Sequence, residues 1–146
     1  MNSKINQNKI PDFQSLKGVK KMSNAKFNYE QEIKTLVDKV ANRAEREVPE
    51  YGYFAPVYEE FANKNPQQNI DKFRLKVFKM PKQDVPDETK RYIEAAVYVP
   101  GSDYKADMLI GAGNKAEILK LLKSDEFPTR LNNAYSKLVD FIQNQG

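Results

Sequence analysis

Two alternating segments joined by a proline–glycine turn constrain the fold of this chain more than any other feature. Residues 92–99 (YIEAAVYV) and 104–112 (YKADMLIGA) place apolar side chains at every second position, which predicts strands with one buried face. Between them, Pro100 sets the first corner of a turn and Gly101 supplies the positive φ of a type II turn. We therefore expect an antiparallel hairpin, and the alternating residues 73–80 (FRLKVFKM) predict a third strand.

The flanking regions have the apolar spacing of amphipathic helices. Asn28 is the expected N-cap of the first helix, and Pro49 ends that helix because the residue before a proline avoids the helical region. Asn114 and Glu117 have the spacing of a capping box at the start of another. Helices are expected over residues 29–48, 114–122 and 124–142.

The order of these elements predicts an α+β fold, a three-stranded antiparallel sheet with N-terminal and C-terminal helices packed on one face. Three strands cannot bury two faces by themselves, so the helices are expected to stack on the same side. With 146 residues, the chain has the length of one domain. We expect a single α+β domain over residues 27–146, an exposed loop over residues 81–90 and a flexible basic leader over residues 1–26.

The positive charge of the chain is concentrated in the leader. The formal net charge is +4, but residues 1–26 contain six lysines and one aspartate, so the rest of the chain is close to neutral. The leader lacks the apolar core of a secretory signal, and no apolar run approaches the roughly 20 residues of a membrane-spanning helix. We expect a cytoplasmic protein that does not enter a membrane.

The composition excludes several kinds of chemistry. The chain has no cysteine, histidine or tryptophan, which removes thiolate and imidazole catalysis and the usual transition-metal ligands. The acidic pairs Glu59–Glu60 and Asp125–Glu126 are adjacent in sequence, so on a helix their side chains diverge by about 100°. We predict no catalytic residues, no metal site and no cofactor. An enzyme that uses carboxylate and lysine chemistry is the third hypothesis.

Five aromatic residues fall within residues 51–61. Pro56 suits the first turn of a short helix that would run to about Asn63. So short a segment cannot bury all five rings, so we expect Phe54 and Phe61 to be inside. Some of the tyrosines are then expected to be exposed, and the predicted partner-binding site is Tyr51, Tyr53 and Tyr58.

The sequence GAGNK follows the third strand and allows two interpretations. Gly111, Gly113, Asn114 and Lys115 precede a helix N-terminus, where free backbone N–H groups and a nearby cation bind anions. The simpler interpretation is that the two glycines permit a tight corner between strand and helix, and we favour it.

A basic row, Arg74, Lys76 and Lys79, is expected on the first strand. It is explained either by cross-strand ion pairs with Glu94 and Asp107 or by nucleic-acid binding. The second interpretation gains weight if tyrosines 92 and 98 share the solvent face with this row, because nucleic-acid platforms interleave aromatic and basic side chains.

The layout of a helix, three antiparallel strands, a glycine corner and a lysine-bearing helix resembles that of double-stranded-RNA-binding domains. The corresponding stretch is GAGNKAEILKLL, residues 111–122. That family places a lysine cluster after the corner to bind phosphates, whereas this chain has Lys115, then Glu117, then Lys120. The resemblance therefore implies the layout without the phosphate-binding groups.

Together these observations predict a small non-catalytic binding or adaptor protein that acts through a protein partner. The tyrosine-rich segment and the open sheet edge are the surfaces we expect it to use, and self-association through either is left open. The alternative is RNA or other nucleic-acid binding through the basic leader, the basic strand row and the GAGNK corner.

Overall fold

The structure is a computed structural model that describes residues 29–65, 67–80 and 90–144. The sequence expectations for the leader (residues 1–26), for Asn28 as an N-cap and for residues 81–89 of the connecting loop lie outside the described residues.

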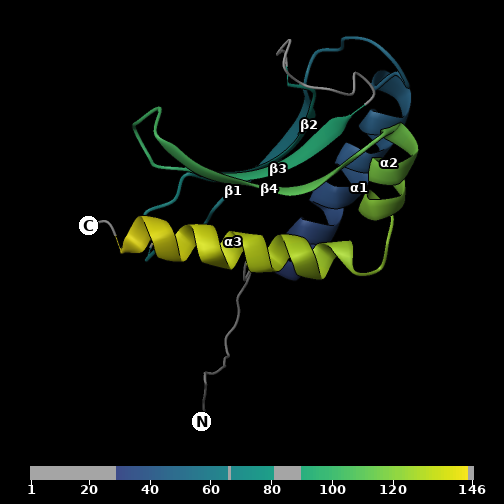
Figure 1. The fold of residues 1–146 in the computed structure, drawn as a ribbon. Helices are drawn as coiled ribbons and strands as arrows, with labels where there is room; N and C mark the ends of the chain where they lie inside the picture. Colours follow the sequence, from purple (N-terminus) through teal and green to yellow (C-terminus); the bar gives the residue numbers. More distant parts are fainter. Residues whose placement is uncertain (1–28, 66, 81–89, 145–146) are drawn as a thin grey trace.

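The fold is α+β, with an antiparallel sheet and helices at both ends of the chain (Figure 1). The strands follow one another in the order β1-β2-β3-β4, each antiparallel to the next. The elements are α1 (Tyr29–Glu47), β1 (Val57–Ala62), β2 (Lys72–Phe78), β3 (Arg91–Tyr98), β4 (Lys105–Gly113), α2 (Lys115–Leu122) and α3 (Phe127–Gln143).

The sheet has four strands, so the expectation of three was wrong. The segment expected to form a short helix after Pro56 is strand β1, which pairs with β2 through Phe61 opposite Phe73 and Val57 opposite Val77. Glu59 lies on the same side of the strand as these apolar residues, where its carboxylate accepts a hydrogen bond from Arg43 of α1 at 3.0 Å. The sheet gains an edge strand that the local sequence pattern did not indicate.

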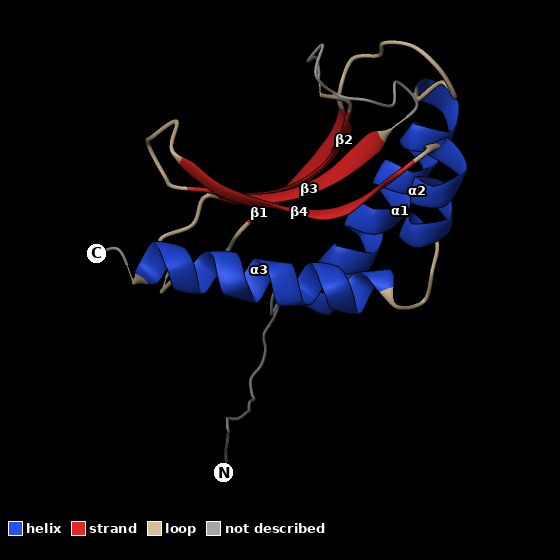
Figure 2. Ribbon diagram, in the orientation of Figure 1, coloured by secondary structure: helices blue, strands red, loops and turns tan. Residues whose placement is uncertain are grey.

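All three helices lie on one side of the sheet (Figure 2). α1 packs on β1 and β2, α3 on β3 and β4, and α2 contacts both α1 and β4. Phe73, Leu75 and Val77 of β2 are completely buried beneath the helices, while the residues between them are half-buried. The core thus lies between the helices and one face of the sheet, and the opposite face carries no helix.

The predicted hairpin is present. Val99 N–H donates to the Tyr104 carbonyl at 3.1 Å, and Gly101 adopts a φ of +68° in the turn. At the other end of β4, a bulge shifts the register between Ile93 and Glu94. Among the described helices, none combines the length and the apolar character that crossing a bilayer requires.

Candidate functional site

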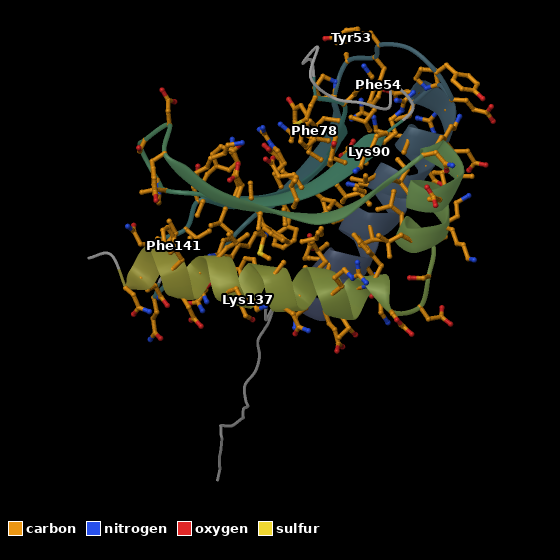
Figure 3. All side chains as sticks on the ribbon, in the orientation of Figure 1. Tyr53, Phe54, Phe78, Lys90, Lys137 and Phe141 are labelled. Atoms are coloured by element: carbon orange, nitrogen blue, oxygen red, sulfur yellow. The ribbon has the colours of Figure 1, made fainter. Side chains whose placement is uncertain are left out.

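The face of the sheet that carries no helix, hereafter the open face, is covered by aromatic and charged side chains (Figure 3). Because side chains alternate along a strand, burying Phe73, Leu75 and Val77 turns Arg74 and Lys76 to this face. The register places on it Tyr58, Glu60, Lys72, Arg74, Lys76, Phe78, Tyr92, Glu94, Tyr98, Lys105 and Asp107.

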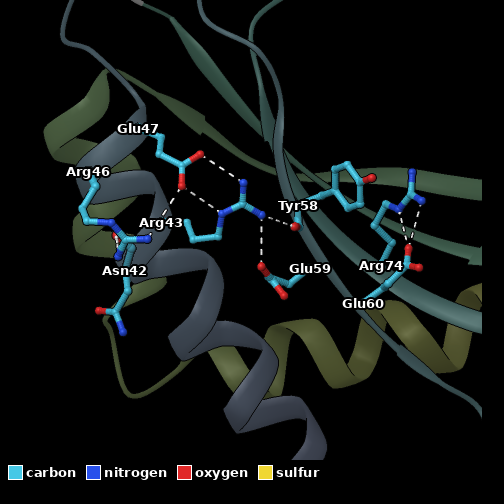
Figure 4. Close-up of polar contacts among 8 residues, drawn as sticks. All are labelled: Asn42, Arg43, Arg46, Glu47, Tyr58, Glu59, Glu60 and Arg74. Carbon is cyan, nitrogen blue, oxygen red and sulfur yellow. Dashed lines mark hydrogen bonds and ion pairs between the residues drawn. The ribbon is translucent and has the colours of Figure 1, made fainter.

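Arg74 is the centre of a stack that joins three strands. Its guanidinium carbon lies 4.2 Å from the ring centre of Tyr58 on β1 and 4.8 Å from that of Tyr98 on β3. Arg74 also forms an ion pair with Glu60 at 2.9 Å (Figure 4). Cation–π contact and ion pairing together favour one arrangement of these side chains.

A second aromatic group lies toward the other end of β2. The rings of Phe78 and Tyr92 are 5.7 Å apart. The ammonium of Lys76 lies 4.9 Å from the Phe78 ring, and that of Lys90 lies 5.7 Å from the Tyr92 ring. The open face therefore interleaves aromatic and basic side chains along its length.

Glu94 is nearly buried in the middle of the open face, with 8% of its surface exposed. Its carboxylate lies 3.6 Å from the ammonium groups of both Lys76 and Lys105, and Lys105 also pairs with Asp107 at 3.2 Å. Desolvation, with a hydrogen bond to Asp107, raises the pKa of Glu94. The pKa of Asp107 is lowered, although burial opposes the shift, because hydrogen bonds from Glu94 and Lys105 favour its charged form. Of the two carboxyl groups, Glu94 therefore has the higher pKa.

The structure splits the three tyrosines predicted to bind a partner. Tyr51 and Tyr53 are on the loop after α1, with 72% and 73% of their surfaces exposed, whereas Tyr58 is in the Arg74 stack with 43% exposed. Phe54 is buried as expected, while Phe61 is only half-buried against the core.

A buried arginine positions the tyrosine loop. Arg91 has no exposed surface and donates hydrogen bonds to the carbonyls of Pro49 at 2.8 Å and Gly52 at 3.4 Å. Its guanidinium also lies 5.1 Å from the ring centre of Phe54. These contacts fix the loop to the end of the sheet where β3 begins.

At the GAGNK corner, internal contacts occupy several of the groups that could bind an anion. The Asn114 side chain accepts from Glu117 N–H, and the Glu117 carboxylate accepts from Asn114 N–H, both at 2.8 Å. Lys115 donates to the Glu45 carbonyl at the end of α1, at 3.0 Å. A Cβ on Gly111 would come within 2.6 Å of Leu121, and Gly113 has a φ of +153°. The two glycines permit the tight corner.

The structure shows the expected cross-strand pairing of the basic row only in part. Lys76 forms the cross-strand pair with Glu94, while Arg74 pairs with Glu60 instead. Tyr92 and Tyr98 do share the open face with this row. The sequence interpretation missed Tyr58 and Glu60 as neighbours of Arg74, because it placed both on a helix.

No group of three or more acidic residues among the described residues is placed to hold a metal ion. An open groove of about 650 Å³ lies between β4 and α3, and the charged residues in its lining are Asp125, Glu126, Arg130 and Lys137. Glu126 and Lys137 are eleven positions apart in sequence, or on the order of 15 Å along a helix. Comparison of the chain with protein family models, curated proteins and solved structures found no match.

Proposed function

We propose that the chain is a small, non-catalytic binding protein that acts through a protein partner, which it contacts with the open face of its sheet. The observation that carries this proposal is the Tyr58–Arg74–Tyr98 stack. Tyrosine and arginine are enriched among the residues that dominate protein interfaces. Side chains already held in place lose little conformational freedom on binding, which favours affinity.

The charge pattern favours a protein over a polyanion. Each cation that β2 and β4 contribute to the open face already pairs with a carboxylate, namely Lys72 and Arg74 with Glu60, Lys76 with Glu94, and Lys105 with Asp107. A phosphate backbone would have to displace these carboxylates. A partner with charges of both signs can extend the same network.

In this proposal, Tyr51 and Tyr53 belong to the same partner-binding surface as the open face. Arg91 fixes their loop at the beginning of β3, next to Tyr92 on the open face. Their large exposed rings fit a role at the rim of the interface. A cytoplasmic location belongs to the same proposal, since a chain without cysteine needs no oxidising compartment to fold.

Site-specific photo-crosslinking in the source cells tests the proposal. The photoreactive residue replaces Ala62 or Ala112, which are exposed and lie on the open face at opposite edges of the sheet. The control position is Lys39, exposed on α1. We expect the same crosslinked protein from both sheet positions and not from position 39. Crosslinking from position 39 alone would contradict the proposal.

Single-stranded nucleic acid is a second candidate ligand for the same face. The observation that favours it is the placement of Tyr92 and Tyr98 beside Arg74 and Lys76, since bases stack on aromatic rings while cations contact the phosphates. Fluorescence anisotropy with a labelled 12-nucleotide single strand tests it. Binding that weakens steeply with salt would support this candidate, and a flat response to salt would remove it.

A further inference from the structure

The outer edge of β4 offers unpaired backbone groups. In an antiparallel pair, residues point their N–H and C=O groups alternately toward the partner strand and away from it. Because Val99 N–H donates to the Tyr104 carbonyl, Tyr104, Ala106 and Met108 point toward β3. Lys105, Asp107 and Leu109 therefore point outward, and the structure gives their backbone groups no partner among the described residues.

Arginine side chains cover part of each outer edge of the sheet. Arg130 of α3 donates to the Ile110 carbonyl at 3.0 Å, at the bulge that ends the regular part of β4. On the opposite edge of the sheet, Arg43 of α1 donates to the Tyr58 carbonyl at 2.8 Å (Figure 4). Residues 105–109 are thus a regular stretch of edge that no arginine covers.

The charges on this stretch are complementary to themselves. If a second β4 pairs antiparallel with Ala106 opposite its own copy, Lys105 of each strand faces Asp107 of the other, and both pairs lie between outward-pointing residues. A shift by one residue on each strand would place Asp107 opposite Asp107, which like-charge repulsion disfavours. One register therefore satisfies both the hydrogen-bond geometry and the charges.

Apolar surface flanks the same edge. Three of the six large hydrophobic side chains that are exposed among the described residues lie there, namely Tyr104, Leu109 and Phe141. Tyr104 and Phe141 line a groove of about 420 Å³ beside Ala106 and Met108. In the register centred on Ala106, Tyr104 of one strand faces Met108 of the other on the helix side of the sheet, which buries part of this surface.

We propose that a second copy of this chain binds the β4 edge, antiparallel about a two-fold axis at Ala106. The pairing joins two four-stranded sheets into one of eight strands. It leaves the stack of each chain uncovered and gives the dimer two open faces side by side. The dimer does not depend on what the open face binds.

Sedimentation velocity on the full chain tests the dimer. We expect the wild-type protein to sediment with the mass of two chains. Lys105→Asp places four carboxylates at the axis, and Asp107→Lys places four ammonium groups there. Either variant should raise the dimer dissociation constant by more than about 100-fold. The controls Lys39→Asp and Asp38→Lys make the same charge changes on exposed α1 and should remain dimeric.

Mixing the two edge variants separates loss of pairing from loss of folding. A one-to-one mixture restores opposite charges at both positions, so we expect a heterodimer although each variant alone is monomeric. The double variant with both substitutions should dimerise with itself. A wild-type chain that stays monomeric at roughly 200 µM overturns the proposal and leaves the edge to a strand of another protein. Edge variants that remain dimeric alone overturn it as well.

Discussion

The guanidinium carbon of Arg74 lies 4.2 Å from the centre of the Tyr58 ring. The two residues are diagonal neighbours on paired strands, since Tyr58 is directly opposite Lys76. This contact joins β1 to β2 on the open face, and the contact of Arg74 with Tyr98 continues it onto β3. The open face is therefore held together by side chains from three strands.

Replacing Arg74 by alanine is expected to lower the free energy of unfolding by about 1–2 kcal/mol, because the substitution removes two cation–π contacts and an ion pair. Urea denaturation measures the loss. Arg46→Ala is the matched control, since the side chain of Arg46 is 66% exposed and its ion pair is 3.7 Å long. It should change stability by less than about 0.5 kcal/mol. Equal effects of the two substitutions would contradict the importance of the stack.

Arg91→Ala is expected to lower the free energy of unfolding by about 3 kcal/mol or more. The substitution leaves a buried cavity and leaves two loop carbonyls without the hydrogen bonds that Arg91 donates. The loop should also become more accessible, so chymotrypsin should cleave faster after Tyr51 and Tyr53. Lys90→Ala, one residue earlier, should leave the cleavage rate close to that of the wild type. Unchanged proteolysis in the Arg91 variant would show that the arginine does not hold the loop.

Glu94 is expected to make stability depend on pH. The folded state raises the pKa of Glu94 above the usual 4.5. The stabilising contribution of Glu94 to the free energy of unfolding is therefore fully present below pH 4.5 and is lost as the pH rises through the raised pKa. The lowered pKa of Asp107 acts in the opposite direction, with a contribution that is present above 3.8 and lost as the pH falls through the lowered value. The Glu94→Gln variant should not show this loss of stability with rising pH. Chemical denaturation from pH 3 to 8 tests this (about the span over which carboxyl groups titrate), and identical curves for both proteins would contradict it.

Gly113→Ala should destabilise the protein more than Gly101→Ala. At Gly101 the φ of +68° disfavours a side chain, but a Cβ would meet nothing within 4 Å, so the cost is about 1 kcal/mol. At Gly113 the φ is +153° and a Cβ would lie 2.8 Å from the Glu117 side chain, so strain and the disturbed capping box add to about 3 kcal/mol. Thermal unfolding gives the ranking, and the reverse order would refute this account of the corner.

The sequence was sufficient for the elements whose signals are local. Apolar spacing and Pro49 located α1, alternation and Gly101 located the β3–β4 hairpin, and the Asn114–Glu117 box located the start of α2. Strand β1 was missed for a physical reason. Pro56 suits the first turn of a helix, whereas the pairing with β2 and the contact from Arg43 to Glu59 are long-range.

The candidate site was predictable only in part. The exposure of Tyr51 and Tyr53 followed from the crowding of five aromatic residues into one short segment. The contact of Lys76 with Glu94 followed from the alternation of side chains along neighbouring strands. The Arg74 stack depends on the register between three strands, which no local pattern specifies. The role of Arg91 was likewise invisible, because its hydrogen-bond acceptors lie about 40 positions away in sequence.

Affinity capture from a lysate of the source cells tests whether the open face binds a protein. Wild-type chain, Arg74→Ala and the control Arg46→Ala are compared with and without nuclease, and the bound proteins are quantified by mass spectrometry. We predict one protein that the wild type and the control retain, that nuclease does not release, and that Arg74→Ala loses. Bound proteins that nuclease releases, or capture that Arg74→Ala leaves unchanged, would contradict the claim.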